Sequence, residues 1–183
     1  ELSLNEHWNM VLNSAILILM HRYPIFSKSK MAKKQYSQKS ISRSIEVPFP
    51  RSQIFDVISN PELHCEFDGS GSVKGLVIGG PLNAVGDSFK AKMKMWGIRY
   101  RVKSTVVEYE RDRLIAWAHL GKHRWRYELD DVPAGTRITE TFDWSFSVFP
   151  RLIEVAGYPE SHPENIERTL ERLANFLADN AQT

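Results

Sequence analysis

The sequence predicts an α+β fold in which a curved antiparallel sheet of about six to seven strands wraps around one long C-terminal helix. Two patterns predict this fold. Alternating apolar and polar residues recur every eight to twelve residues between 72 and 148, separated by hairpin turn signals. Residues 161–180 then carry one apolar stripe at helical spacing. A single sheet must cover its apolar face, and this helix is the predicted cover.

The elements follow in a clear order. The stretch "SISRSIEV" alternates up to Pro48 and predicts the first strand. A helix is predicted from Pro50 to Asn60-Pro61, and a second short helix from about Pro61 to Phe67, ahead of "DGSG". Six more strands are predicted at 72–78, 87–96, 98–109, 113–119, 122–130 and 136–148. Residues 149–160 are expected to form a short helical flap, and Ser161 is the predicted N-cap of the final helix.

Composition argues against a general nucleic-acid binder. Residues 1–40 hold six of the 24 Lys and Arg and two of the 22 Asp and Glu, which leaves 18 bases and 20 acids, a net charge of −2, for residues 41–183. We therefore predict no nucleic-acid partner. The single cysteine, Cys65, cannot form an internal disulfide and fits a reducing compartment, so we predict a cytoplasmic protein.

Two regions are predicted, an N-terminal extension at 1–40 and one domain at 41–183. The apolar run at 8–20 is shorter than a membrane span and contains Asn13 and Ser14. It also lacks the preceding positive charge of a signal peptide. Residues 1–40 are interpreted as a segment outside the core, with "MAKK" at Met31 as a natural start of translation. The alternative is an amphipathic anchor in which residues 8–34 contact anionic lipid.

The body resembles a known superfamily over residues 41–180. The matching stretches are "IEVPFPRSQIFDVISNPE", "GGPLNAVGDSF", "VVEYERDRLIAW", "YELDDVPAGTRITETFDW" and "IERTLERLANFLAD". They are similar to the SRPBCC or START-like superfamily, also called Bet v 1-like helix-grip, in its polyketide cyclase/dehydrase and lipid transport branch. This resemblance implies a hydrophobic or aromatic small-molecule ligand in a cavity between sheet and helix. It implies no particular reaction, because the fold hosts carriers, receptors and enzymes.

Alternation along the strands predicts which side chains face this ligand. The basic residues of "SFKAKMKMWGIRYRVKS" share the outer face, where they are expected to contact solvent. The predicted ligand-binding residues are Phe89, Met93, Met95, Ile98, Tyr100, Val102, Trp125, Tyr127, Glu140, Phe142 and Trp144 on the sheet, with Leu170 and Leu173 on the helix. Phe146 is placed on the same face. Trp125, Phe142 and Trp144 equally suit a packed core.

Polar side chains on this apolar face are the candidates for chemistry. A lone buried carboxylate is costly, so Glu140 is expected either to pair with a neighbour or to face the ligand. A contact with His123 or Tyr127 would make Glu140 part of an acid–base pair. Glu140 and His123 are thus the catalytic candidates, for a cyclase, dehydratase or hydrolase alternative to simple binding. A third alternative is a partner-binding module that uses the basic outer face.

His64 and Asp68 lie one helical turn apart and allow two interpretations. They could form a proton-transfer pair or part of a metal site, or Asp68 could hydrogen-bond the backbone of a turn. No Cys/His spacing predicts a metal, and no dinucleotide fingerprint, P-loop or nucleophile elbow is present, so no metal or cofactor is predicted. The sequence does not predict the oligomeric state.

Overall fold

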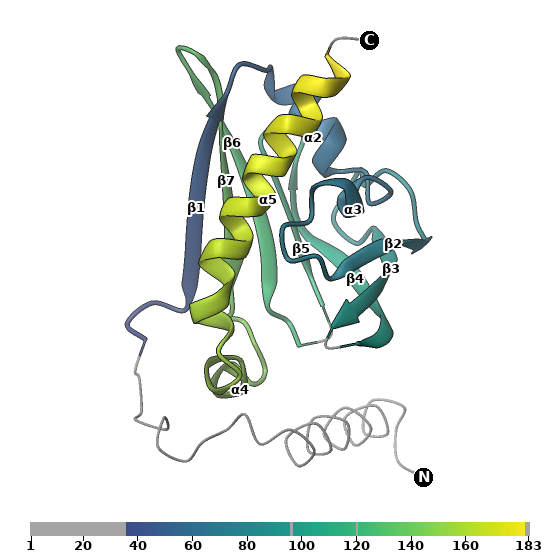
Figure 1. Cartoon of the computed structure of the whole chain (residues 1–183), viewed down its shortest axis with the longest axis vertical. Coiled ribbons are helices and arrows are strands. Elements are labelled where there is room, and N and C mark those ends of the chain that lie inside the picture. Colours follow the sequence, from purple (N-terminus) through teal and green to yellow (C-terminus); the bar gives the residue numbers. More distant parts are fainter. Residues whose placement is uncertain (1–35, 96, 120, 182–183) are drawn as a thin grey trace. The chain divides into compact units, whose positions relative to one another are not determined.

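A computed structural model describes residues 36–95, 97–119 and 121–181 (Figure 1). The predicted anchor at 8–34 lies outside these residues. The elements, in chain order, are β1 (Ser40–Val47), α2 (Arg51–Ile58), α3 (His64–Phe67), β2 (Val73–Ile78), β3 (Ser88–Met95), β4 (Ile98–Glu110), β5 (Leu114–Ala118), β6 (Arg124–Val132), β7 (Gly135–Asp143), α4 (Pro150–Val155) and α5 (Tyr158–Asn180). Within the described residues, no helix combines the length and the apolar character needed to cross a bilayer. The predicted α+β order is confirmed.

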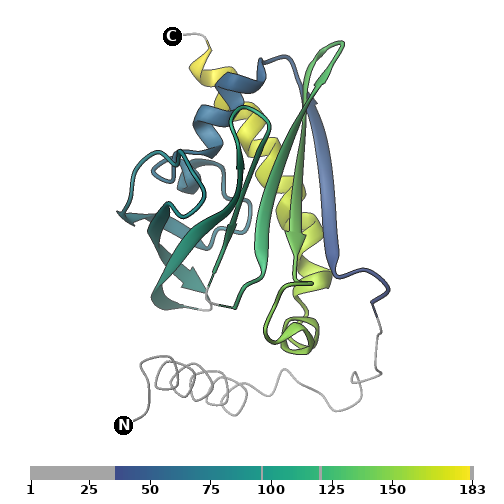
Figure 2. The same cartoon turned by 180° about the vertical axis from the view of Figure 1, so that it is seen from behind.

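The seven strands form one antiparallel sheet in the order β1-β7-β6-β5-β4-β3-β2. The sheet curves, and α5 lies across its concave face, as the views from both sides show (Figures 1 and 2). Among the strands, the backbone of α5 packs most closely against β1 and β7. Strands β3 to β6 therefore face α5 mainly through side chains. This predicted helix-grip arrangement is confirmed, and it places the inner face of β3 to β6 where a ligand was expected.

Several predicted boundaries were wrong. The last strand ends at Asp143 rather than at residue 148, and the second short helix spans only His64–Phe67. Helix α5 begins at Tyr158, three residues before the predicted N-cap Ser161. Gly157 adopts a left-handed conformation with φ 76° and separates α4 from α5. Pro159 lies in the first turn of α5, where its missing amide proton costs no hydrogen bond. Of residues 149–160, Pro150–Val155 form the short helix α4, and the last three belong to α5.

A register shift within β4 changes which side chains of its second half face the core. Val106 pairs with Trp117, but Glu108 pairs with Ala116, so Val107 is an extra residue on its strand. The bulge lets Tyr109 face inward, where its ring meets Phe55 of α2 edge-on at 5.6 Å between centroids. Strict alternation along β4 would have placed Tyr109 outside.

The backbone of the loop that follows α3 is hydrogen-bonded to side chains of α5. The amide of Gly69 donates to Thr169 Oγ1 at 2.9 Å, and Arg168 Nε donates to the carbonyl of Gly69 at 3.0 Å. Arg172 donates to the carbonyl of Asp68 at 2.8 Å. A Cβ atom on Gly69 would lie 2.4 Å from the carbonyl oxygen of Asn165 and 2.4 Å from the amide nitrogen of Thr169. The loop therefore requires glycine at this position.

We expect Gly69→Ala to destabilise the protein by about 1–3 kcal/mol, because the added methyl group pushes the loop away from α5. Urea unfolding followed by circular dichroism measures the change. Gly80→Ala is the matched control, since a Cβ atom there meets nothing within 4 Å and the φ of Gly80 is not left-handed. Equal stability of Gly69→Ala and the wild type would contradict this account of the loop.

Candidate ligand-binding site

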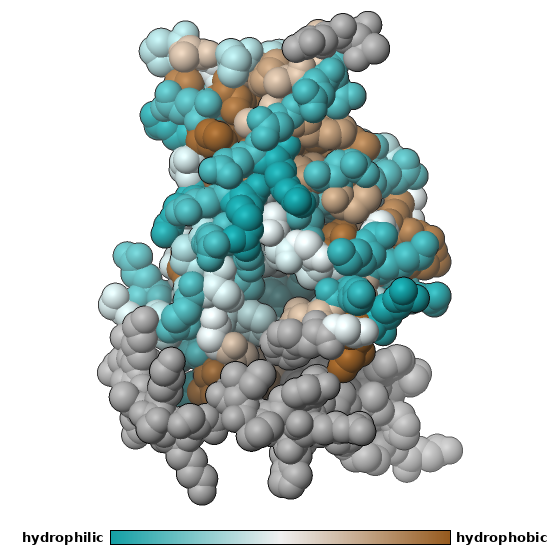
Figure 3. All heavy atoms as spheres, viewed as in Figure 1, coloured by the Kyte–Doolittle hydropathy of each residue, from teal (hydrophilic) through white to brown (hydrophobic). Residues whose placement is uncertain are grey.

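The predicted ligand-binding residues differ in how deeply they lie. The buried ones are Phe89, Tyr127, Glu140, Phe142, Trp144, Leu170 and Leu173. The half-buried ones are Met93, Met95, Val102, His123 and Trp125. Ile98 and Tyr100 are exposed, at 49% and 36%, near the β3–β4 turn. Burial thus falls toward the end of the sheet where β3 ends and β4 begins. Figure 3 shows a recess on the α5 side of the molecule, between α5 and strands β2 and β3.

Phe146 does not lie on the inner face, and that prediction was wrong. The strand ends at Asp143, so its alternation does not continue to residue 146. The Phe146 side chain is 50% exposed, and the guanidinium of Arg124 lies 3.5 Å from the centroid of its ring. Phe146 therefore belongs to the outer surface near α4.

Glu140 is the buried carboxyl group of the inner face, 3% exposed. Tyr127 lies directly opposite on β6 and hydrogen-bonds this carboxyl group. The second oxygen, Oε2, is buried and has no hydrogen-bond partner in the described part of the chain. Burial raises the pKa of Glu140 to about 8, despite the opposing effect of the Tyr127 hydroxyl. At neutral pH the group is therefore a protonated acid that can both donate and accept a hydrogen bond.

Arg43, a candidate counter-ion for Glu140, forms an ion pair with another residue. Arg43 on β1 is the register partner of Glu140 across the β1–β7 pair. Its Nε donates instead to Glu167 Oε1 on α5 at 2.6 Å. Of the two predicted pairings of Glu140, the structure provides the one with Tyr127. The contact with His123 is not among the contacts of the described residues, and His123 packs against Phe142 instead.

Three histidines gather where β5, β6 and α5 meet. His119 shares a 2.8 Å hydrogen bond through Nδ1 with Ser104 Oγ, and its ring lies edge-on to His123 at 5.1 Å. His162 on α5 contacts the rings of Phe142 and Trp125, and its Nδ1 is buried without a hydrogen-bond partner in the described residues. Burial lowers the pKa of His119 to about 3 and the pKa values of His123 and His162 to about 4. All three rings are neutral at physiological pH.

His64 and Asp68 have structural roles, as the turn interpretation predicted for Asp68. His64 Nε2 donates to the carbonyl of Ile58 at 2.8 Å, its ring stacks on Trp117, and burial lowers its pKa to about 4. Asp68 Oδ1 accepts from the amide of Ser70 and Oδ2 from the amide of Val73, at 3.1 and 2.8 Å. In residues 36–95, 97–119 and 121–181, no group of three or more His, Cys, Asp or Glu side chains is placed so that it could hold a metal ion.

His119, Tyr158 and His162 were not among the predicted site residues. His119 continues the inward alternation of Ile115 and Trp117 by one step beyond the strand. Tyr158 and His162 extend the apolar stripe of α5 backward from Ile166 in steps of four. Following the alternation to the end of the predicted strand at 113–119, and the helical stripe back past Ser161, would have found them. The Tyr158 hydroxyl lies 3.8 Å from Met95 Sδ, which joins the start of α5 to the end of β3.

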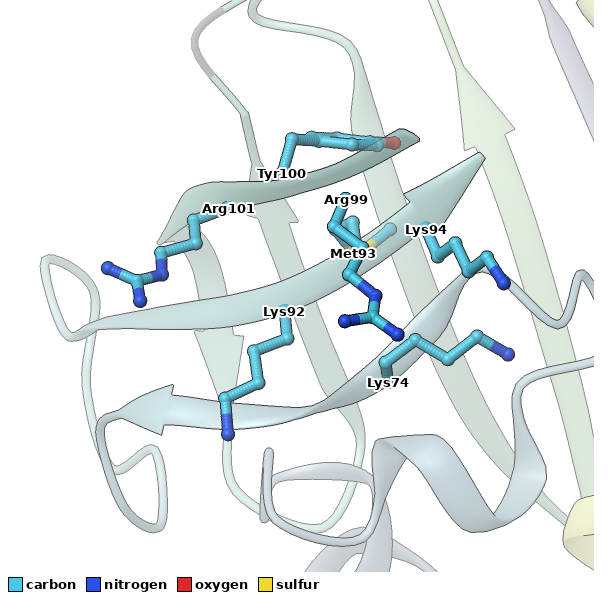
Figure 4. Close-up of a pocket in the computed structure, with 7 residues that line it drawn as sticks. All are labelled: Lys74, Lys92, Met93, Lys94, Arg99, Tyr100 and Arg101. Atoms are coloured by element: carbon cyan, nitrogen blue, oxygen red, sulfur yellow. The ribbon is translucent and has the colours of Figure 1, made fainter. Parts of the chain in front are cut away.

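A groove with a volume of about 610 Å³ lies along the β2–β3–β4 edge of the sheet. Its lining residues are Lys74, Lys92, Met93, Lys94, Arg99, Tyr100 and Arg101. Figure 4 shows Lys74, Lys92 and Arg99 gathered on one side of β3, with Lys94 and Arg101 on the two flanks. Two predicted ligand-binding residues, Met93 and Tyr100, thus border a strongly basic groove.

Comparison with known proteins identifies relatives of the whole domain. The family model described as polyketide cyclase / dehydrase and lipid transport matches residues 38–177. The Mycobacterium tuberculosis proteins Rv0088 and MT0096 are each 36% identical over 143 residues, which cover 75% of this chain and 64% of the relative. The chain therefore spans less than two thirds of the length of these relatives.

Solved structures share the fold at low sequence identity. Ms6760 from Mycobacterium smegmatis has a TM-score of 0.61 at 11% identity, with 81% of this chain and 96% of that chain covered. The Polyketide_cyc-like protein Cgl2372 from Corynebacterium glutamicum has a TM-score of 0.51 at 17% identity, covering 80% and 96%. The AHSA1-like protein from Aeromonas hydrophila has a TM-score of 0.52 at 19% identity, covering 75% and 94%.

Proposed function

We propose that this chain, which belongs to the polyketide cyclase/dehydrase and lipid transport family, binds a hydrophobic or aromatic small molecule with one polar end. The ligand would lie between the inner face of β3 to β6 and α5, as in a carrier or sensor. The observation that carries the proposal is Glu140, a buried carboxyl group with an unpartnered oxygen among aromatic side chains.

Glu140 is suited to hold the polar end of a ligand. A buried polar atom without a partner costs about 1–3 kcal/mol, which a ligand hydroxyl or carbonyl could recover by hydrogen bonding to Oε2. The neutral Tyr127 hydroxyl fixes the other side of the carboxyl group. The unpartnered Nδ1 of His162 offers a second polar contact nearer to the start of α5. Together they favour an uncharged polar group over an anion or a cation.

The apolar body of the ligand would contact the half-buried residues of the same face. Met93, Met95 and Val102 keep partial exposure although they face inward. Methionine side chains adapt to ligands of different shape. Trp125 and the neutral histidines provide flat surfaces for an aromatic ligand. The exposed Ile98 and Tyr100 suit the entrance rather than the interior.

A bulky side chain on the inner face should weaken ligand binding. We expect Val102→Trp to weaken binding of the neutral probe N-phenyl-1-naphthylamine at least about tenfold, because the indole occupies the volume of the ligand. Lys103→Trp adds the same side chain on the outer face and should bind as the wild type does. Probe fluorescence measures both. The proposal fails if the wild type has no saturable site, or if Val102→Trp and Lys103→Trp bind equally.

A catalytic function is the second candidate, and the Glu140–Tyr127 pair favours it. A protonated carboxyl group beside a neutral phenol can act as a general acid toward a carbonyl ligand. Any turnover found with an aromatic or polyketide-like substrate should be lost in Glu140→Gln, while substrate binding persists. Turnover that survives in Glu140→Gln would exclude this residue from the chemistry.

A further inference from the structure

Five cations of the β2–β4 edge form a cluster without partners in the described residues. They are Lys74, Lys92, Lys94, Arg99 and Arg101, which line the groove together with Met93 and Tyr100. None of them takes part in a salt bridge or a side-chain hydrogen bond in residues 36–95, 97–119 and 121–181. Cross-strand pairing places Lys92 beside Arg101 and Lys94 beside Arg99, so like charges face each other.

Cations on other strands of the sheet form ion pairs. On the neighbouring outer face, Arg124 and Arg126 both bind Glu108, at 2.8 and 3.0 Å. On β7, Arg137 binds Glu46 of β1 at 2.7 Å. Strands β3 and β4 carry no acidic residue before Glu108. A solvated strand face alone does not account for this difference, because like charges opposite each other are destabilising. The groove is therefore complementary to an anionic partner.

Exposed apolar side chains lie beside this cluster. Ile98 and Tyr100 are exposed on the same strand as Arg99 and Arg101. Phe149 and Val155, at the two ends of α4, are 47% and 45% exposed. The contact of Tyr158 with Met95 connects the start of α5, just after α4, to the end of β3, and Figures 1 and 2 show α4 and the end of β3 at the same end of the sheet. This end thus combines cations with an apolar rim.

We infer that this end of the domain docks on an anionic phospholipid bilayer. The five cations would bind lipid phosphates, while Ile98, Phe149 and Val155 would enter the boundary between head groups and acyl chains. A free phosphate or a nucleic-acid backbone would use the cations but not the aliphatic rim. Docking would also place the half-buried end of the inner site next to the bilayer. The inference rests on the outer groove and does not require the proposed inner site.

Vesicle co-sedimentation of the full chain tests this inference. The wild type should bind vesicles of phosphatidylcholine with phosphatidylserine more tightly than pure phosphatidylcholine vesicles, and added salt should weaken that binding. The double variant Lys92→Gln with Arg101→Gln should partition about 25-fold less, at roughly fivefold for each cation. Ile98→Ser with Phe149→Ser should also weaken binding, without changing its dependence on salt.

The control removes the same charge elsewhere. Arg111→Gln with Arg113→Gln changes two arginines at the opposite turn, between β4 and β5, where each has a carboxylate partner. This variant should bind vesicles within about twofold of the wild type. Equal weakening by both double variants would show only a net-charge effect and would overturn the inference. So would unaltered binding of the groove variant, tighter binding to RNA than to anionic vesicles, or complete competition by glycerol 3-phosphate.

Discussion

Lowering the pH from about 7 to about 5 is expected to reduce the free energy of unfolding by about 5 kcal/mol. His64, His119, His123 and His162 have folded pKa values of about 4, 3, 4 and 4, below the ordinary value of 6.5. The unfolded chain therefore binds more protons in this range, and stability falls as the pH falls. Each histidine costs about 2 kcal/mol, and the raised pKa of Glu140 offsets about a third of the total.

Urea unfolding at a series of pH values measures this effect. A loss of this size is a large part of the 5–15 kcal/mol typical of a domain, so the protein should approach unfolding near about pH 5. His162→Gln should recover about 2 kcal/mol of the loss, since glutamine does not titrate. His7→Gln removes a histidine outside the described residues and is the matched control. Constant stability between these pH values would contradict the burial of the four neutral rings.

Ionisation of Glu140 should reduce the free energy of unfolding at alkaline pH. Its folded pKa of about 8 lies above the ordinary value of 4.5, so its contribution is complete below about pH 4.5 and is lost as the pH rises through about 8. The whole effect is about 5 kcal/mol, of which about 2 kcal/mol falls between about pH 6.5 and 8.5. Glu140→Gln keeps a neutral side chain of the same shape, so it should lack this loss and show only the gain of about 2 kcal/mol that the four buried histidines give over this interval.

Comparing the pH dependence of stability in three proteins distinguishes the titration of Glu140 from that of other groups. Glu128→Gln is the control, because Glu128 lies on the neighbouring strand and binds Arg126 on the outer face. Relative to Glu140→Gln, the wild type and Glu128→Gln should both lose about 2 kcal/mol of stability between about pH 6.5 and 8.5. If all three curves coincide, Glu140 does not titrate in this range, and its proposed role as a protonated hydrogen-bond partner is wrong.

Most of the fold could be predicted because the period of side-chain alternation reports burial directly. Phe89, Tyr127 and Phe142 were placed on the inner face from alternation alone, and all three are buried. The pairing of Glu140 with Tyr127 followed as one of two predicted contacts. Which one forms depends on the β6–β7 register, which places Tyr127 directly opposite Glu140 and which alternation does not determine.

What sequence reasoning missed lies mostly where elements begin and end. Tyr158 was missed because α5 begins before its predicted N-cap, and Phe146 was misplaced because β7 ends early. Tyr109 faces inward only because of the bulge in β4, and no local residue pattern predicts this bulge. Arg43 forms its ion pair with Glu167 rather than with Glu140, and Glu167 lies on a helix far away in sequence.

The central claim is that a small molecule binds between the inner face of the sheet and α5, and the methionines test it most directly. The chain has five methionines, and only Met93 and Met95 lie in the domain, with Met95 in contact with Tyr158 of α5. We propose an NMR titration of methyl-¹³C-methionine protein with N-phenyl-1-naphthylamine. The Met93 and Met95 signals should shift through the ring current of the bound probe, in a saturable manner that Val102→Trp abolishes. Saturation of the probe without any shift of Met95, or shifts confined to Met10, Met20 and Met31, would contradict the claim.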